Sequence, residues 1–287
     1  MRRAISWLLR IFVSRESLRL VVQAVADEAS QALQNREGTG SARAQQIPSA
    51  ATVDLARRLI VLEERMGGTE DGIPVERVSS HDPRLLSDFP LHGQTGGDRM
   101  SPQRHNYAAG YAGVLTELIG AGAQTEDFEG AIVEIGILKG TGLGIWSELF
   151  PRATVIGLDV DTTLFARNRG NLARESPNVE RALVYEFDQF NPTFEWWNLA
   201  GRPELDLVID DGYHSTLASL YTLARFVQSC RFSPNARYVV EDIPNFASQV
   251  ESNFPGLSAD SDGEFTVVRG FSDLVKSANL LGPEESN

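Results

Sequence analysis

The chain has 287 residues, of which 42% are hydrophobic and 23% are charged. These proportions are typical of a globular protein and exclude a wholly disordered chain, a collagen and a coiled-coil rod. The formal net charge of −13 argues against a general nucleic-acid binder, because such a protein must neutralise phosphates. The single cysteine, Cys230, excludes an internal disulfide and a cysteine-based zinc cluster, and we expect it to be buried.

The N-terminal residues 1–36 predict basic amphipathic helices, because apolar residues recur there at helical spacing among arginines. The segment 2–13 is expected to pack on the body of the protein or on a second copy in a homo-oligomer, or to lie on a membrane surface. Its apolar runs are too short and interrupted for a membrane span or a signal peptide. We therefore expect a cytoplasmic protein, with peripheral membrane contact through 2–13 as the alternative.

The rest of the chain divides into three segments that differ in composition and in the pattern of their apolar residues. Residues 37–52 are small and polar and predict a linker. Residues 53–125 predict a lead-in with a short helix at about 53–66, loops and a lid. Residues 126–287 alternate short apolar strands with helical stretches, which predicts a doubly wound, Rossmann-like α/β domain with a mostly parallel sheet.

The elements expected within this domain follow a regular order. The strands are predicted at 131–135, 153–158, 182–186, 206–210 and 237–241, and the helices near 142–150, 162–174, 215–229 and 244–252. The strands are continuous apolar runs, as expected when helices cover both faces of a sheet. Near the end of the chain, 264–269 and 278–282 predict an antiparallel pair.

A glycine-rich turn after the first strand indicates a cofactor site. Gly136 and Gly140 let the backbone approach a ligand, and Asp159, at the end of the second strand, can accept ribose hydroxyls. Glu134, just before the turn, suits the ammonium group of a methionine moiety and would repel a pyrophosphate. Because the pattern G-x-G-x-x-G is incomplete here, S-adenosylmethionine is favoured over a dinucleotide, and a glycine turn without a ligand is the third interpretation.

Four further residues are candidates for the cofactor pocket. Asp188 and Gln189 follow the third strand, and Asp210 ends the fourth. Tyr107 lies in a group with His105 and Tyr111 that predicts either a lid over the cofactor or aromatic core packing.

Three carboxylates follow the fourth and fifth strands. Asp211 comes directly after one strand, and Glu241 and Asp242 end the other. Because the ends of neighbouring parallel strands share one edge of a sheet, these groups would repel each other unless a cation neutralised them. Oxygen ligands of this kind suit Mg²⁺. Helix capping by Asp210 and Asp211, and ordinary turn chemistry at Glu241 and Asp242, are the alternatives.

Four segments in this order resemble class I S-adenosylmethionine-dependent methyltransferases, in particular the metal-dependent sugar O-methyltransferases of macrolide biosynthesis and the related cephalosporin hydroxylase-like group. They are Gly97-Asp98-Arg99 with the spaced His105, Tyr107 and Tyr111, the turn VEIGILKGTGLG (133–144), DLVIDDGYHS (206–215) and YVVEDI (238–243). The sequence departs from the family at Tyr213, where a small residue is common, and at Phe187, where a glycine usually precedes the acid.

The resemblance implies residue roles and an activity. Asp211, Glu241 and Asp242 would bind Mg²⁺, and His214 would act as the general base beside Asp211. The expected activity is transfer of a methyl group from S-adenosylmethionine to a sugar hydroxyl of a glycoside or glycan, with no nucleic-acid partner. A metal-independent methyltransferase of small molecules and a non-catalytic adenosine-ligand binding protein are the alternatives.

Overall fold

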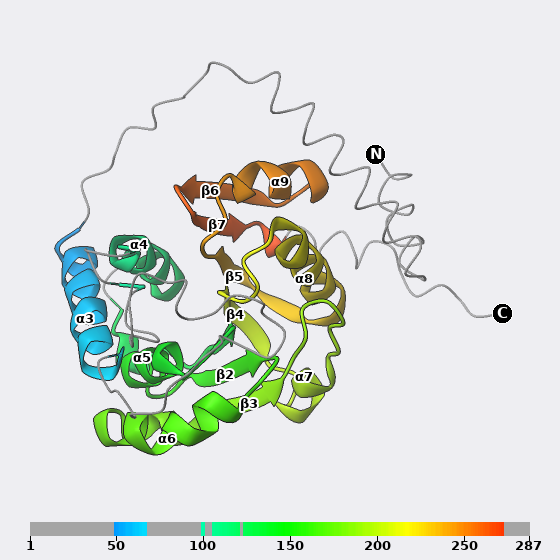
Figure 1. The fold of residues 1–287 in the computed structure, drawn as a ribbon. Helices are drawn as coiled ribbons and strands as arrows, with labels where there is room; N and C mark the ends of the chain where they lie inside the picture. Colours follow the sequence, from blue (N-terminus) through cyan, green and yellow to red (C-terminus); the bar gives the residue numbers. More distant parts are fainter. Residues whose placement is uncertain (1–48, 68–98, 101–104, 121–122, 273–287) are drawn as a thin grey trace. The chain divides into compact units, whose positions relative to one another are not determined.

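The computed structural model describes residues 49–67, 99–100, 105–120 and 123–272. At their centre lies a seven-stranded sheet with the strand order β3-β2-β1-β4-β5-β7-β6 (Figure 1). The strands from β3 to β5 pair in parallel, and β7 pairs antiparallel with both β5 and β6. Because β3-β2-β1-β4-β5 is the order of the doubly wound dinucleotide fold, the predicted Rossmann-like class is confirmed.

The strand positions follow the apolar runs of the sequence. The structure has β1 (Ala131–Ile135), β2 (Thr154–Asp159), β3 (Leu183–Glu186), β4 (Glu204–Asp210), β5 (Arg231–Val240), β6 (Ser258–Asp262) and β7 (Phe265–Arg269). The central strand β1 is buried along its whole length. This is the burial expected of a parallel strand with helices on both sides.

The helices divide between the two faces of the sheet. They are α3 (Ala50–Gly67), α4 (Ala108–Ile119), α5 (Thr141–Leu149), α6 (Thr163–Glu175), α7 (Glu195–Leu199), α8 (Thr216–Ser229) and α9 (Phe246–Asn253), with short 3-10 turns at Thr125–Asp127 and Pro177–Arg181. Apolar side chains of α3 to α6 share one core, and those of α7 to α9 share the other. Alternate residues of each strand point into opposite cores, as the pleat requires.

The antiparallel pair differs from the prediction. The segment 264–269 does form β7, but its partner is β6, the hairpin arm that precedes it. The predicted partner, 278–282, lies outside the described residues. β6 has the sequence SADSD and is mostly exposed, so it lacks the apolar run by which the other strands were predicted.

Three more elements differ from expectation. α3 begins at Ala50, inside the predicted linker, and α4 forms within the lead-in at 53–125, where helical and loop segments with a lid were predicted but no bounds were given for a second helix. α7 was not predicted.

Cys230 was expected to be buried but is only partly buried. The predicted helices within 1–36 lie outside the described residues, and among the described helices none is long and apolar enough to cross a membrane.

Candidate functional site

The candidate site lies at the carboxyl ends of β1, β4 and β5, which are neighbours in the sheet. Glu134 is near the end of β1, Asp211 directly follows β4, and Glu241 and Asp242 directly follow β5. The amides of Asp211 and Glu241 still donate to carbonyls of neighbouring strands, at 3.0 and 3.1 Å. The sheet therefore brings the predicted carboxylates together at one edge, where open α/β sheets bind ligands.

A buried guanidinium, that of Arg99, joins three of these carboxylates. Its Nη1 donates to Glu134 Oε1 at 2.7 Å, its Nη2 donates to Asp211 Oδ2, and its Nε lies 3.0 Å from Glu241 Oε2. Each nitrogen thus contacts a carboxylate from a different strand end. Burial lowers the pKa of Arg99, but the charges of Glu241, Glu134 and Asp211 outweigh it and raise that pKa well above its usual value.

Two tyrosines cover the carboxylates from the side of α4. The hydroxyl of Tyr111 donates to Glu241 Oε1, and the hydroxyl of Tyr107 donates to Asp242 Oδ1 at 2.6 Å. The rings of Tyr107 and Tyr111 pack against Phe265, with centroid distances of 5.1 and 5.0 Å. Tyr107, predicted as a lid over the cofactor, therefore lies beside the acidic group that follows β5.

His214 faces two carboxylates without touching either. Its Nε2 is 3.8 Å from Asp211 Oδ1, and its Nδ1 is 3.7 Å from Asp242 Oδ2. The buried Nδ1 has no hydrogen-bond partner among the described residues. His214 and Asp242 both adopt left-handed backbone, with φ of 54° and 59°, a strained conformation that is common at functional sites. Ligand atoms of Asp211, His214 and Asp242 lie within 4.8 Å of one another, close enough to share one cation.

The second oxygen of the Asp242 carboxylate, Oδ1, faces His105. The Nδ1 of His105 lies 3.1 Å from Asp242 Oδ1. Burial alone would raise the pKa of Asp242, but hydrogen bonds from His105 and Tyr107 and the proximity of His214 lower it to about 2. Asp242 is therefore a carboxylate that stays ionised, as a cation ligand must.

The glycine turn forms the cofactor side of the site. Gly136 has φ of 84°, and a Cβ on it would lie 2.1 Å from the Asp211 carbonyl oxygen, so only glycine lets the turn pack on the loop after β4. Gly140, with φ of 83°, precedes α5 as its N-cap. Beside the turn, Glu134 Oε2 and Trp146 Nε1 are both buried and make no hydrogen bond of normal geometry among the described residues, although burial raises the pKa of Glu134 and the nearby Trp146 indole opposes that rise.

Two predicted acids lie further along the same edge. Asp159 ends β2 and accepts the amides of Leu138 (2.9 Å) and Asp161 (3.0 Å), which fix its carboxylate beside the glycine turn. Asp188 follows β3, is partly buried and accepts the amide of Phe190 at 2.9 Å. Their contacts to the adenosine part of a cofactor stay predictions.

Gln189 and Asp210 form an internal brace. Gln189 Nε2 donates to Asp210 Oδ1 at 2.8 Å, and its Oε1 accepts the amide of Tyr213 at 2.8 Å. The other oxygen of Asp210 accepts from Tyr238 at 3.1 Å. These two predicted cofactor residues are therefore engaged within the protein, where they fix the loop that carries Asp211 and His214.

The alternative interpretation of Asp210 and Asp211 as helix caps is wrong. Ser215 is the N-cap of α8, and its hydroxyl accepts the amide of Ala218 at 3.2 Å. Asp211 instead faces Arg99 and His214, and burial raises its pKa despite the opposing charge of Arg99. Its carboxylate is thus committed to the site.

Arg99 is the site residue that sequence reasoning missed. The signal was present, since Arg99 belongs to the Gly97-Asp98-Arg99 segment that carried the family resemblance, but no pattern assigned it a contact. Its partners Glu134 and Asp211 lie 35 and 112 residues away, and only the folded chain brings them together.

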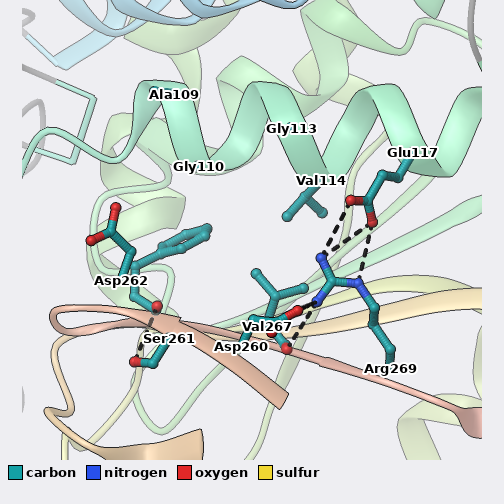
Figure 2. Close-up of a pocket in the computed structure, with 11 residues that line it drawn as sticks. Ala109, Gly110, Gly113, Val114, Glu117, Asp260, Ser261, Asp262, Val267 and Arg269 are labelled. Carbon is teal, nitrogen blue, oxygen red and sulfur yellow. Dashed lines mark hydrogen bonds and ion pairs between the residues drawn. The ribbon is translucent and has the colours of Figure 1, made fainter. Parts of the chain in front are cut away.

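A separate cavity of about 250 Å³ lies between α4 and the β6–β7 hairpin (Figure 2). Its wall includes Phe265, which also packs on Tyr107 and Tyr111. At one end Arg269 joins Glu117 (3.2 Å) and Asp260 (2.9 Å). The cavity and the site therefore share one aromatic wall.

Comparison with known proteins finds similarity only among solved structures. No model of a known protein family matches the chain, and no curated protein matches it. Structures of MycE, a methyltransferase of the mycinamycin biosynthetic pathway in complex with Mg and SAH, and with mycinamycin VI in addition, are 18% identical, with TM-scores of 0.43 and 60% of this chain covered. The match spans about half of the MycE chain, 51% and 50% in the two structures.

A further match is the human methyltransferase 10 domain containing protein, at 12% identity and a TM-score of 0.45, covering 79% of this chain and 99% of that one. These similar structures are methyltransferases, as the sequence resemblance implied. The Rossmann-like fold of this chain follows from its own strand order.

Proposed function

We propose that this chain is an S-adenosylmethionine-dependent O-methyltransferase that acts on a sugar hydroxyl of a glycoside or glycan and uses Mg²⁺. One observation carries the proposal. Glu134 has a buried carboxylate oxygen, Oε2, that makes no hydrogen bond among the described residues, and one guanidinium joins Glu134 to Asp211 of the Asp211–His214–Asp242 group. A cofactor with its cationic end at Glu134 and an acceptor held by a metal ion at the second group would lie side by side at this edge of the sheet.

The residues present fit the cofactor. Glu134 Oε2 is buried and offers an acceptor to the ammonium group of the methionine moiety. Asp159, fixed by two backbone amides, offers its remaining lone pairs to the ribose hydroxyls. When bound, S-adenosylmethionine supplies an electrophilic methyl group on a sulfonium, and the acidic surroundings suit its positive charge.

The residues present also fit a divalent cation. Asp211 and Asp242 direct one carboxylate oxygen each toward the space beside His214, and carboxylate oxygens are the ligands that Mg²⁺ prefers. When bound, Mg²⁺ would lower the pKa of a hydroxyl that binds it, which otherwise lies far above neutral pH. A vicinal diol, as on a sugar, would fill two open positions at once.

His214 has the place and chemistry of the base. Its imidazole faces the same space as the Asp211 and Asp242 oxygens, and histidine can accept a proton near neutral pH. The acceptor oxygen would form its bond to the methyl carbon as the carbon–sulfur bond of the sulfonium breaks and leaves a neutral thioether, and the proton of the hydroxyl would pass to His214. Tyr107 and Tyr111 cover the carboxylates and limit the access of water, and much of the rate would come from positioning.

Labelled S-adenosylmethionine incubated with fractions of a cell extract, with and without Mg²⁺, tests the proposal. We expect a methylated glycoside or glycan, identified by mass spectrometry, and loss of transfer with EDTA or with Asp211→Asn. Cofactor binding in calorimetry without transfer to any fraction would favour a non-catalytic adenosine-ligand binding protein.

A metal-independent methyltransferase is the second candidate, and Arg99 is the observation that favours it. Its guanidinium already neutralises two of the three predicted metal ligands, Asp211 and Glu241. Full turnover in EDTA would select this candidate. Membrane contact through 2–13 and homo-oligomerisation stay predictions, because residues 1–48 lie outside the described part of the chain.

A further inference from the structure

Some carboxylate oxygens of the site are bound by Arg99 or a tyrosine hydroxyl, and others face His214. Both oxygens of Glu241 are engaged, one by Arg99 Nε at 3.0 Å and the other by the Tyr111 hydroxyl. The two oxygens of Asp211 have different partners, because Oδ2 accepts a hydrogen bond from Arg99 while Oδ1 faces His214. The oxygens left for an exchangeable cation are therefore Asp211 Oδ1 and Asp242 Oδ2.

Arg99 is held in place from both sides of its backbone. Its carbonyl accepts the amide of Tyr107 at 3.0 Å, which ties it to the start of α4. The next amide, of Met100, donates to Glu63 Oε2 at 2.7 Å, which ties it to α3. The side chain of Met100 is fully buried. Arg99 is thus a fixed part of the core and not a mobile surface arginine.

We propose that Arg99 is a built-in cation that keeps Glu241 out of the metal site, so that an exchangeable divalent ion binds only between Asp211, Asp242 and His214. Glu241 then serves as a counter-ion of Arg99 and not as a metal ligand. The inference rests on the proposed function only in naming a divalent cation as the ion. Arg99 is a positioning residue, because it acts through the carboxylates and touches no reacting atom.

The physical reason is the charge of the cluster. Without the charge of Arg99, the buried Glu134 and Glu241 and the partly buried Asp211 would have no counter-charge, and buried charges must be paired or bind a metal. Replacing Arg99 with a neutral side chain should therefore release Glu241 to bind a metal ion. The proposal predicts a gain of metal affinity, which the loss of a purely structural arginine would not produce.

Manganese titration followed by electron paramagnetic resonance tests this. We expect Arg99→Met to bind Mn²⁺ at least about tenfold more tightly than the wild type, because one positive charge beside the ion is gone. The gain should disappear in Arg99→Met with Glu241→Gln, and Arg99→Lys should keep the affinity of the wild type. Unchanged or weaker binding by Arg99→Met, or a gain that survives Glu241→Gln, would overturn the proposal.

Arg269→Met is the matched control. Arg269 also joins two carboxylates, Glu117 and Asp260, but beside the cavity between α4 and the hairpin (Figure 2). Its loss should leave Mn²⁺ affinity unchanged. If the wild type binds no Mn²⁺ and Arg99→Met does, the cation site between Asp211, Asp242 and His214 fails together with the proposed Mg²⁺ dependence, while the exclusion of Glu241 by Arg99 is supported. If neither binds, the role of Arg99 fails.

A crystal of the wild-type protein soaked in Mn²⁺ provides a second measurement that does not depend on the variants folding. The anomalous peak should lie between Asp211 and Asp242, with Glu241 still on Arg99. A peak at ligand distance, about 2.0–2.2 Å, from a Glu241 oxygen would overturn the proposal.

Discussion

Among single residues, His214 lies where the proposed reaction would need a proton acceptor, and its backbone there is left-handed, with φ of 54°. Neither ring nitrogen is within hydrogen-bond distance of Asp211 or Asp242, so one can accept a proton from a substrate. We predict that His214→Asn lowers methyl transfer about 10²–10⁴-fold. Binding of S-adenosylhomocysteine in calorimetry should stay within about twofold, because Glu134 and Asp159 are untouched. Retained turnover would remove His214 from the role of base.

The hydroxyl of Tyr111 is a second residue-level feature with a measurable task. Tyr111 is fully buried and its hydroxyl donates to Glu241. Tyr111→Phe leaves a Glu241 oxygen without its donor, and we predict a loss of about 1–3 kcal/mol in the free energy of unfolding in urea. Tyr185→Phe, at a partly buried tyrosine outside the site, is the control and should change it by less than about 0.5 kcal/mol. Equal effects of the two variants would contradict the prediction.

Among the elements, the sequence predicts those whose burial dictates an apolar pattern and fails where it does not. The strand at Ala131–Ile135 is found at its predicted bounds because it is buried on both faces. β6 exposes most of its polar side chains, so backbone pairing with β7, and not an apolar pattern, makes it a strand. α4 contains Gly110 and Gly113, which weaken a helical prediction, although its other residues pack on α3 and the sheet.

Two glycines with opposite surroundings test the glycine turn. A Cβ on Gly136 would strike the Asp211 carbonyl oxygen, and its φ of 84° disfavours other residues. Gly136→Ala should therefore lower the free energy of unfolding by about 1–3 kcal/mol or more and weaken cofactor binding. Gly170, within α6, would place an added Cβ in open space, with no atom within 4 Å, so Gly170→Ala should stabilise by up to about 1 kcal/mol. Urea unfolding measures both, and destabilisation by Gly170→Ala would contradict this reasoning.

For the whole molecule, topology explains how much of the site the sequence could reveal. Parallel strands place their carboxyl ends on one edge, so the proximity of Asp211, Glu241 and Asp242 could be predicted once the strands were assigned. The direction of each side chain could not. Glu241 contacts Arg99 and Tyr111. Arg99 lies outside the strands and supplies the positive charge that the acidic strand ends lack.

The same cluster makes the stability of the whole chain depend on pH. Burial raises the pKa of Glu134, Asp211 and Glu241, although the charge of Arg99 opposes the shift. An acid with a raised folded pKa stabilises the fold below its unfolded pKa, near about 3.9 for Asp and 4.3 for Glu, and loses that contribution as the pH rises through the folded pKa. Asp242, with a pKa lowered to about 2, has the opposite effect only at more acidic pH.

The melting temperature of the ligand-free protein should therefore rise as the pH falls through the raised pKa values of these acids toward their unfolded values, near about 4. The net charge of −13 acts in the same direction, since protonation reduces the repulsion among acids. Each kcal/mol gained should raise the melting temperature by about 2–4 °C for a chain of this size. Glu241→Gln removes one of the three buried acids and should reduce the dependence, whereas Glu251→Gln, at an exposed position, should not. A melting temperature that falls steadily over this range would show that the carboxylates at the strand ends are not buried together.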